Sequence, residues 1–599
     1  MNPVPVTATP TRRSLVLSLA FAAAMVAAAA FVARVLFVRY LMHDFVFLSR
    51  DYHWMTPLGY LLLFGALAIP VGVVARFLTP AQAAQSSVWA FATMVLFDFL
   101  LPFTEIGLFP AFMLAAGAGT VISRRAVLAW ERLPRLSILT GSLLAVPVLL
   151  GTFIGGDRAP ETTGSAPVGA PNVLLIILDT VRADELGVYG YARPTTPAID
   201  AFAQKSVVFE SAIATAPWTL PSHAGIFTGQ YAANLNADYK APLDRRDSTL
   251  AELMARRGYQ SFGAVGNVAY ASWESGLARG FQTFRDLPRS FEQVLKSTHF
   301  GRTEFTAQVL AASSLRQVAG AIRRLELQEN PLPKLVENTA EEISSEFLRW
   351  HAGRDTTRPY LAFLNYFDAH DPYEPIEPFR TRFQGTTDSA KRAPSPRDLY
   401  DAELAYLDEQ LGRLFQTLES SGALRNTLVI ITADHGEHFG ERNMLGHFNS
   451  IYAPLLHVPL IVRLDGRLSA GMRVGGEVSL RDLGATILDL TGLTAPFPGR
   501  TLSGRWRGDT ATTSPAIASY NVVRGESLTA LADGMLSMVR DGWQYILSGT
   551  KEFEELYGYR QDPTLLQNRV GSDTGLVLVP QFRREVRRVL GDERGTPEK

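Results

Sequence analysis

The run Asn172-Val-Leu-Leu-Ile-Ile-Leu-Asp179 is apolar throughout between its polar first residue and its acidic last residue. A second run, Thr427-Leu-Val-Ile-Ile-Thr-Ala-Asp434, has nearly the same form and is followed at once by His435. Short apolar runs bounded by turn residues predict buried parallel strands. In open α/β sheets, ligands bind at the carboxyl ends of the strands. The two runs therefore predict an α/β fold whose acidic groups gather at one edge of the sheet.

These strand ends carry the side chains of a metal site. Asp179, Asp434 and His435 supply two carboxylates and an imidazole, a set that suits a divalent cation. Trp218-Thr-Leu-Pro-Ser-His223 adds a hydroxyl that such a cation activates. One strand alone can end on an aspartate that only caps the next helix, but two such acids and a third polar motif favour a site. We therefore predict that Asp179, Thr219, Asp434 and His435 hold one divalent ion.

The mixture of oxygen and imidazole ligands favours zinc or manganese, because calcium prefers oxygen alone and is the lesser alternative. A second ion held by Asp368, Asp371 or His447 is less favoured than a single one. With the ion bound, the hydroxyl of Thr219 would attack phosphorus or sulfur, and the resulting ester on threonine would pass to water or to an acceptor alcohol. Ser222 is the competing nucleophile.

The N-terminal part of the chain predicts a membrane domain. The chain has 599 residues, is 47% hydrophobic and has a mean hydropathy of +0.07, high for a wholly soluble protein. The excess lies in five apolar stretches near the about 20 residues that a helix needs to cross a bilayer: 15–33, 58–75, 88–103, 106–122 and 136–154. We expect a transmembrane domain over 1–154 with about five helices. Four spans or a re-entrant pair stay open, because the third stretch is short and carries Asp98.

The cations near these stretches predict the orientation of the chain. Arginines precede the first stretch and crowd the loop before the last: Arg12, Arg13, Arg124, Arg125, Arg132 and Arg135. Because short cytoplasmic loops are rich in Lys and Arg, everything after the last stretch is expected outside, in the periplasm or the extracellular space. A linker rich in Gly, Pro, Thr and Ser follows over 155–170. The chain has no cysteine, so the outer domain needs a core of its own. A net charge of −1 gives no reason to expect nucleic acid.

Several linked motifs together resemble the sulfatase family of the alkaline phosphatase superfamily. They are Asn172–Asp179, Thr219–Gly229, Asp368–Tyr373, Thr432–Gly436 and Gly446–Pro459, with Met538–Ile546 and Glu554–Tyr557 near the C-terminus. The resemblance implies a three-layer sandwich of the alkaline-phosphatase and sulfatase type over 171–500. It also implies a small C-terminal sheet subdomain and tail over 501–599.

The chain departs from the family pattern at the residues that carry chemistry. Sulfatases place a cysteine or serine, oxidised to formylglycine, where this chain has Thr219, and threonine cannot be converted in that way. Thr180, His223 and Asn267 stand where the pattern has a second acid, an arginine and a lysine. A threonine nucleophile and several membrane spans resemble the phosphoethanolamine transferases and lipoteichoic acid synthases. Those relatives, however, lack the C-terminal motif.

Six of the ten histidines fall within the motif segments. We assign His370 and His447 to substrate binding and to protonation of the leaving group. His223 contacts the transferred group in place of the arginine, or else is a structural histidine at a helix start. His438 and His457 are interpreted as structural.

Three function classes remain at this point. The preferred one is a membrane-anchored, metal-dependent hydrolase of sulfate or phosphate esters that acts on a glycan or lipid on the extracytoplasmic side. The second is a transferase that moves a phosphoethanolamine or glycerophosphate type of group to a lipid or glycan. The third is an inactive member that binds a glycan. The stretch from Phe291 to His351, mostly helical in pattern, is expected to form an insertion or a cap near the sheet.

Overall fold

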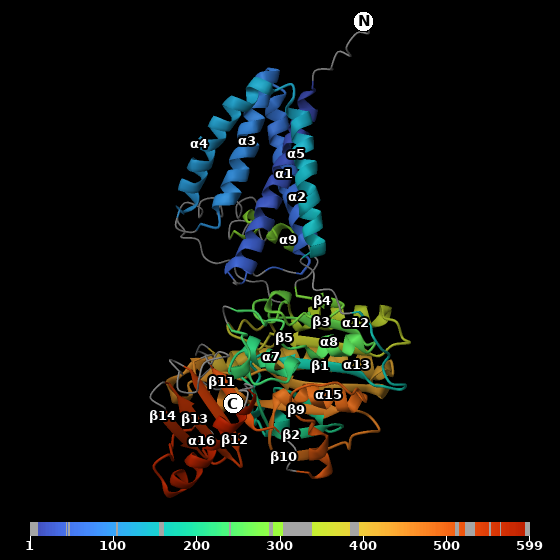
Figure 1. Ribbon diagram of the computed structural model, residues 1–599, viewed down its shortest axis with the longest axis vertical. Helices are drawn as coiled ribbons and strands as arrows, with labels where there is room; N and C mark the ends of the chain where they lie inside the picture. Colours follow the sequence, from blue (N-terminus) through green and yellow to red (C-terminus); the bar gives the residue numbers. More distant parts are fainter. Residues whose placement is uncertain are drawn as a thin grey trace, which may run out of the picture. The chain divides into compact units, whose positions relative to one another are not determined.

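The computed structural model describes the chain except for residues 1–9, 43–44, 46–47, 49, 104–105, 155–160, 239–240, 287–290, 304–337, 384–393, 448, 510–513, 521–533, 550–552, 563–564 and 594–599. The chain forms two compact units (Figure 1). The first contains Met1–Gly156 and Pro288–Leu335, and the second contains Asp157–Leu287 and Val336–Lys599.

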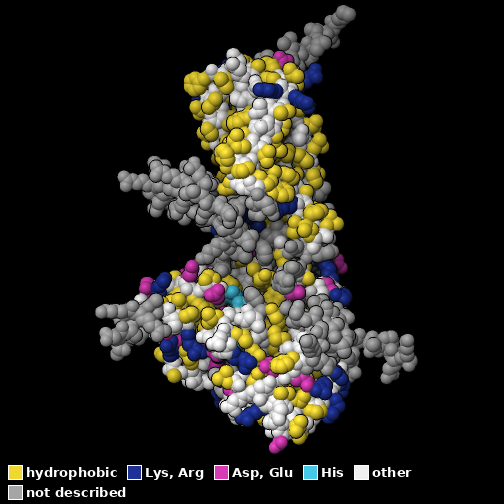
Figure 2. Space-filling view, turned by 90° about the vertical axis from the view of Figure 1, so that its left-hand side faces the viewer, with side chains coloured by type: hydrophobic (Ala, Val, Ile, Leu, Met, Phe, Trp, Pro, Cys, Tyr) yellow, Lys and Arg dark blue, Asp and Glu magenta, His cyan; other side chains and the backbone are white. Residues whose placement is uncertain are grey.

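The first unit is a bundle of apolar helices: α1 (Arg12–Phe37), α2 (Tyr52–Ala75), α3 (Pro80–Leu100), α4 (Leu108–Ala126) and α5 (Leu133–Ile154). Helix α1 packs against α2, α3 and α5, and α3 packs against α4. Within the described residues, α1 to α3 and the stretch Leu108–Ala129 are long and apolar enough to cross a membrane, and a shorter apolar helix covers Leu133–Val148. Hydrophobic side chains cover much of the face of this bundle that Figure 2 shows, and Phe77 and Phe109 are 86% and 73% exposed. Such a surface fits a lipid environment.

A later segment of the chain returns to this bundle. Helix α9 (Phe291–Lys296) packs on α2, and the Thr56 hydroxyl donates to the carbonyl of Ser297 at 3.0 Å. The buried carboxylate of Asp98 accepts from the Tyr60 hydroxyl at 2.6 Å and from the backbone N–H of Phe300 at 3.0 Å. Polar groups inside an apolar bundle need such partners.

This finding corrects the expectation for the segment from Phe291 to His351. Its first part, through Thr303, belongs to the helical bundle and not to a cap near the sheet. Its last part forms α12 (Ala340–Gly353), which covers the sheet. The intervening residues 304–337 lie outside the described part of the chain. The helical pattern was visible in the sequence, but a pattern does not name the surface on which a helix packs.

The second unit is built on a mixed eight-stranded sheet with the order β10-β2-β9-β6-β1-β5-β3-β4. Strand β9 runs antiparallel to its neighbours β2 and β6, and the other pairs are parallel. The strands are β1 (Asn172–Leu178), β2 (Val207–Ile213), β3 (Gln260–Val265), β4 (Thr283–Arg285), β5 (Tyr360–Tyr366), β6 (Thr427–Ala433), β9 (His457–Arg463) and β10 (Met472–Ser479). The apolar runs that precede Asp179 and Asp434 form the adjacent central strands β1 and β6, which are buried as predicted.

Helices cover both faces of this sheet. On β5, Phe363 contacts helix α7 (Thr219–Thr228), whereas Tyr366 bonds to Ser344 of α12 at 2.9 Å. Because alternate residues of a strand point to opposite faces, α7 and α12 lie on opposite sides of the sheet. The three-layer α/β arrangement is thereby confirmed. The other helices are α6 (Pro197–Ala203), α8 (Leu250–Arg256), α13 (Pro396–Ser420), α14 (Ala453–Leu456) and α15 (Leu483–Thr491).

A small antiparallel sheet follows, as predicted: β11 (Ala516–Tyr520), β12 (Met535–Arg540), β13 (Trp543–Ser548) and β14 (Phe553–Tyr557). Helix α16 (Asp573–Glu593) packs on it through Phe582, which stacks on Tyr545 at 5.6 Å between ring centroids. A two-stranded hairpin, β7 (His438–Phe439) with β8 (Leu445–Gly446), follows β6.

Candidate active site

The site residues meet because neighbouring strands end at the same level. Leu178 of β1 pairs with Ala433 of β6, so Asp179 and Asp434 follow their strands side by side. On the other side of β1, the register places Asn365 of β5 beside Ile177. The predicted gathering of acids at one edge of the sheet is therefore present.

Asp179, Asp434 and His435 form a compact cluster. One ligand atom from each lies within 4.8 Å of the others, and no other group of this kind is found among the described residues. The Nε2 atom of His435 lies 3.8 Å from Asp179 Oδ1 and 3.5 Å from Asp434 Oδ2. All three side chains are fully buried, and neither His435 Nε2 nor Asp434 Oδ2 makes a hydrogen bond. Buried polar atoms normally have partners. The two carboxylates and the imidazole therefore fit a set of ligands for a bound cation.

Electrostatics support the same conclusion. Burial raises the pKa of Asp434 well above its usual range, and the neighbouring charge of Asp179 adds to the rise. Burial and the nearby His447 lower the pKa of His435 well below the usual range for histidine. Without a cation, two buried carboxylates repel each other and one retains a proton. A divalent cation would remove that repulsion.

Thr219 completes the cluster from a third segment. It is the first residue of α7 and is 2% exposed. Its Oγ1 lies 3.5 Å from Asp179 Oδ1, and the amide of Asn267 donates both to Thr219 Oγ1 at 3.1 Å and to Asp179 Oδ2 at 3.0 Å. The positive end of a helix dipole favours negative charge, so the start of α7 would stabilise an alkoxide at the position of Thr219. Asn267, which stands where the family pattern has a lysine, thus joins the predicted nucleophile to a predicted metal ligand.

Ser222, the competing nucleophile, has another role. Its hydroxyl is fully buried and donates to the carbonyl of Asp434 at 2.6 Å. Ser222 therefore ties α7 to the end of β6. Thr180, in place of the second acid, has the left-handed φ of 58°, which is unusual for a β-branched residue. This conformation directs its backbone N–H to Asp434 Oδ1 at 3.3 Å.

His370 and His447 lie beside the cluster. The ring of His447 is 4.7 Å from that of His435 and 4.8 Å from that of His370, between centroids. Glu437 accepts from His447 Nδ1 at 3.1 Å and from the Tyr373 hydroxyl at 3.2 Å. The structure thus brings both histidines of the predicted leaving-group site to the predicted metal ligands.

His223 lies behind the nucleophile. It is fully buried, with Nδ1 2.9 Å from the carbonyl of Thr219 and 3.4 Å from Asp434 Oδ2. Burial lowers the pKa of His223, which favours the neutral ring. This position suits a residue that holds Thr219 and Asp434 in place better than one that touches the transferred group.

The remaining acid and histidine candidates lie in structural contacts. Asp368 accepts from the backbone N–H of Ala340 at 2.9 Å, at the start of α12, and burial raises its pKa to about 6. Its other oxygen, Oδ2, is buried without a hydrogen bond, but Asp368 belongs to no group of three metal-binding side chains among the described residues. His438 Nε2 lies 2.8 Å from the hydroxyl of Ser450, and His457 Nε2 lies 2.9 Å from the carbonyl of Glu210.

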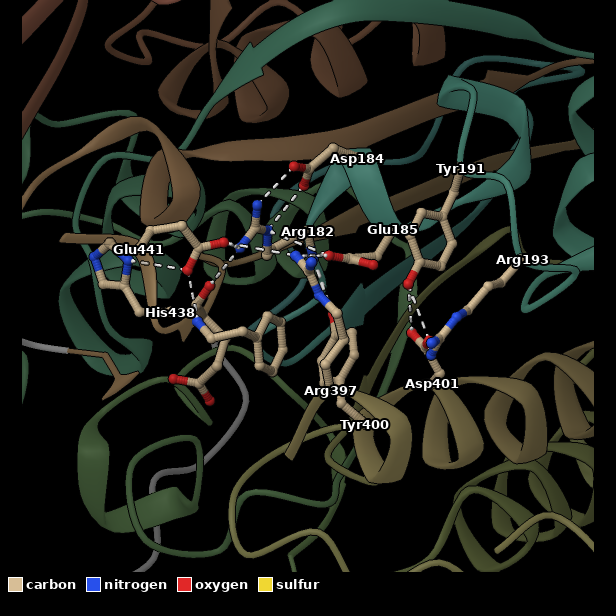
Figure 3. Close-up of polar contacts among 12 residues, drawn as sticks. Arg182, Asp184, Glu185, Tyr191, Arg193, Arg397, Tyr400, Asp401, His438 and Glu441 are labelled. Carbon is tan, nitrogen blue, oxygen red and sulfur yellow. Dashed lines mark hydrogen bonds and ion pairs between the residues drawn. The ribbon is translucent and has the colours of Figure 1, made fainter. Parts of the chain in front are cut away.

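A buried ionic cluster joins the loops that follow β1 and β6 (Figure 3). Arg182 donates to both oxygens of Asp184 at 2.8 and 2.6 Å, to Glu441 at 2.7 Å and to the carbonyl of Glu437 at 3.1 Å. Burial alone would raise the pKa of Glu441, but the neighbouring His438 and the charge of Arg182 hold it well below its usual range. Arg182 thus fixes the loop after β1 to the loop after β6.

Sequence reasoning missed three contributors to this site. Asn365 donates to Asp179 Oδ2 at 3.3 Å, and the only signal was an amide inside an otherwise apolar and aromatic strand. Glu437 lies within the motif Asp434-His-Gly-Glu437, but its role depends on the approach of His447 ten residues later. Arg182 lies three residues after Asp179, and no role was predicted for it. Each needed a contact between segments that the sequence alone does not fix.

Comparison with known proteins supports the architecture and identifies the family. The chain is 25% identical over 437 residues to human arylsulfatase D, covering 59% of this chain and 70% of that protein. It is 26% identical over 462 residues to mouse steryl-sulfatase, covering 61% and 70%. Its fold is similar to the crystal structure of a phosphonate monoester hydrolase of Agrobacterium radiobacter, with 22% identity, a TM-score of 0.53 and coverage of 71% of this chain and 96% of that one. The sulfatase family model matches residues 171–493. The chain therefore belongs to the sulfatase family and is a sulfatase-like hydrolase.

Proposed function

We propose that this chain is a membrane-anchored, metal-dependent hydrolase that cleaves sulfate or phosphate esters through Thr219. The observation that carries the proposal is the position of Thr219 Oγ1, 3.5 Å from Oδ1 of Asp179, which itself clusters with Asp434 and His435. A divalent cation held by these four residues would make the alkoxide of threonine accessible near neutral pH. The imidazole of His435 favours zinc or manganese over calcium.

The chain's own residues supply the other steps. Asn267 orients Thr219 for attack, because its amide holds the nucleophile and Asp179 at 3.1 and 3.0 Å. His370 and His447 bind the ester and protonate its leaving oxygen. The helix start at Thr219 stabilises negative charge on the transferred group. Water then releases the ester formed on threonine.

Metal analysis and three model esters test this proposal. The purified full-length protein is expected to contain one zinc or manganese per chain, and removal of the metal with EDTA is expected to abolish turnover. Hydrolysis of 4-nitrophenyl sulfate, 4-nitrophenyl phosphate and bis(4-nitrophenyl) phosphate measured side by side identifies the ester class. Thr219→Ala should remove the activity, and mass spectrometry of trapped wild-type protein should place the transferred group on Thr219. Full turnover by Thr219→Ala, or no turnover of any ester by the metal-loaded protein, would contradict the proposal.

We infer that the substrate is a sulfated or phosphorylated glycan or lipid on the extracytoplasmic side of the membrane. The arginine-rich loop before α5 and the apolar helices support this placement. Because the chain has no cysteine, single cysteines report on sidedness. An impermeant maleimide should label Ser420→Cys in intact cells, and it should label Ala129→Cys only after lysis. The reverse pattern would place the catalytic domain inside.

Transfer of a phosphoryl-alcohol group from a lipid is the second candidate. The unmodified threonine and the apolar helical bundle favour it, because such a bundle places the catalytic domain close to lipid head groups. The protein in vesicles of phosphatidylethanolamine and phosphatidylglycerol tests this candidate. A lipid-derived adduct on Thr219 that is released by an alcohol faster than by water would favour the transferase over the hydrolase.

A further inference from the structure

Asn365 is the only amide side chain in β5, and it is fully buried. The strand lies between β1 and β3, and the register places Asn365 beside Ile177 of β1 and beside Val265 of β3. Asp179 and Asn267 each stand two residues further along these strands, so both lie just beyond the strand ends. Asn365 is therefore placed to contact the ends of both neighbouring strands.

Both ends of the Asn365 amide make such a contact. Its Oδ1 accepts from the backbone N–H of Asn267 at 2.9 Å, and its Nδ2 donates to Asp179 Oδ2 at 3.3 Å. These neighbours fix the orientation of the amide, because an N–H group needs an acceptor and a carboxylate needs a donor. The backbone carbonyl of Asn365 accepts from the N–H of Gly266 at 2.8 Å. The side chain thus adds one hydrogen bond beyond the end of the ladder between β5 and β3.

The side chain of Asn267 is also held in one orientation. Its Oδ1 accepts from the backbone N–H of Tyr270 at 3.0 Å, so its Nδ2 faces the cluster. That Nδ2 donates to Thr219 Oγ1 at 3.1 Å and to Asp179 Oδ2 at 3.0 Å. The position of this amide depends on the backbone of Asn267, which Asn365 holds. Displacement of a positioning group by about 1 Å can lower a rate by about 100-fold.

We propose that Asn365 is a positioning residue that acts through Asn267 to hold Thr219 Oγ1 where it attacks the ester. The inference rests on the proposed function and assigns one further residue to it. The link runs from Oδ1 of Asn365 to the backbone of Asn267, and from the amide of Asn267 to Thr219. Neither asparagine titrates, so this link needs no change of charge at either residue. The contact of Asn365 with Asp179 is a separate link, and the experiments distinguish the two.

Hydrogen exchange tests the first contact without metal or turnover. Asn365→Leu keeps the branched shape of the side chain and removes its acceptor, so the backbone N–H of Asn267 loses its partner. In purified full-length protein treated with EDTA, exchange at the Asn267 amide should be at least about 10-fold faster than in wild type, while exchange over 427–433 stays unchanged. If Asn365→Leu does not yield folded protein, Asn365→Ala takes its place in all measurements.

Kinetics at saturating metal test the role in the reaction, with the model ester that the wild-type protein cleaves fastest. Asn365→Leu should lower kcat by about 10- to 100-fold and leave KM within about 2-fold, because the nucleophile is misplaced while ester binding is retained. In an Asn267→Ala background, the same change should cost less than about 3-fold, because Asn365 acts through Asn267.

Gln260→Met is the matched control. Gln260 is a buried amide at the opposite end of β3, where its Nε2 donates to the carbonyls of Asp355 at 2.6 Å and Arg358 at 3.2 Å. Its replacement removes hydrogen bonds from the same strand at the end away from Thr219. Gln260→Met should therefore leave both kcat and exchange at the Asn267 amide within about 2-fold of wild type.

Four results would overturn the inference. They are unchanged exchange at the Asn267 amide in Asn365→Leu, a wild-type kcat in that variant, an equal loss of kcat in Gln260→Met, and a full loss that persists in the Asn267→Ala background. The last result would place the effect of Asn365 on Asp179 instead of Asn267. In each case the proposed function still stands, because the wild-type protein turns over. Failure of the proposed function is different, since the wild-type protein would then cleave no ester, whatever the exchange at Asn267.

Discussion

Arg182 offers a test of how the site is held together. Its guanidinium is 5% exposed and joins Asp184, Glu441 and the carbonyl of Glu437, which lies two residues after His435 (Figure 3). Replacement by methionine keeps much of the volume and removes the charge and every donor. The loop that carries His435 then loses one anchor, and Glu441 keeps only the longer ion pair with Arg397, at 3.6 Å.

The structure sets the size of the effect. Breaking a buried ion pair by removal of one partner costs about 3–5 kcal/mol. Glu441 is 14% exposed and belongs to that class, whereas Asp184 is 51% exposed, so water replaces most of what it loses. We therefore expect Arg182→Met to lower the free energy of unfolding by about 3 kcal/mol. For a domain of roughly 400 residues this corresponds to a fall in Tm of about 3–4 °C. Loss of a group that orients metal ligands should weaken metal affinity by about 10- to 100-fold.

Arg193→Met is the matched control. Arg193 donates to Asp398 at 2.9 Å and to the buried Asp401 at 2.6 Å. Both acids lie on α13 and not in the loop after β6. Its removal should also lower the Tm, but it should leave metal affinity within about 2-fold of wild type. Zinc or manganese affinity is measured by competition with a chelator, and Tm by thermal unfolding of the metal-free protein. Wild-type metal affinity in Arg182→Met, or an equal loss in Arg193→Met, would refute the reasoning.

Three further predictions follow from single contacts. Asn267→Ala removes the amide that donates to Thr219 and Asp179. We expect kcat/KM to fall by about 10- to 100-fold, with little change in Tm. A variant as active as wild type would show that the amide does not orient the nucleophile. Arg442 lies 4.3 Å from the centroid of the Tyr452 ring and ties the hairpin loop to the C-terminal sheet through Glu555; Arg442→Gln should speed hydrogen exchange over 438–447, and unchanged exchange would contradict this role. Asp98→Leu leaves the backbone N–H of Phe300 without its acceptor, at a cost of about 1–3 kcal/mol, and should speed exchange over 291–303 in detergent while 427–433 stays protected.

The fold was predictable because its strongest signals are local. The apolar composition of two short runs predicts two buried strands, and an acid follows each of them. Asp179 and Asp434 then lie side by side because the two strands are parallel neighbours. The apolar N-terminal stretches are equally local, and each lies in a helix of the bundle. The small C-terminal sheet was predicted because two short motifs near the C-terminus resemble those of sulfatases.

The rest depended on contacts that no local pattern encodes. The sequence could mark Asn267 as a departure from a family pattern, but only the chain's path places its amide between Asp179 and Thr219. The segment after Phe291 has a helical pattern that fits either unit. Its assignment to the bundle rests on contacts such as those of Phe300 with Asp98 and of Ser297 with Thr56.

Several features that destabilise the folded state lie close together around Asp434. Their concentration there supports a functional site. Thr180 adopts a left-handed backbone conformation that costs about 1–3 kcal/mol. Asp434 is a buried carboxylate beside a second one, and His435 has a buried ring nitrogen without a hydrogen bond. A sequence selected only for stability would remove such features, because each opposes folding. One divalent cation would offset the two electrostatic defects together, since it neutralises both carboxylates and accepts the lone pair of the imidazole. The metal-loaded protein should therefore unfold at a higher temperature than the metal-free protein, and the difference should shrink in Asp434→Asn.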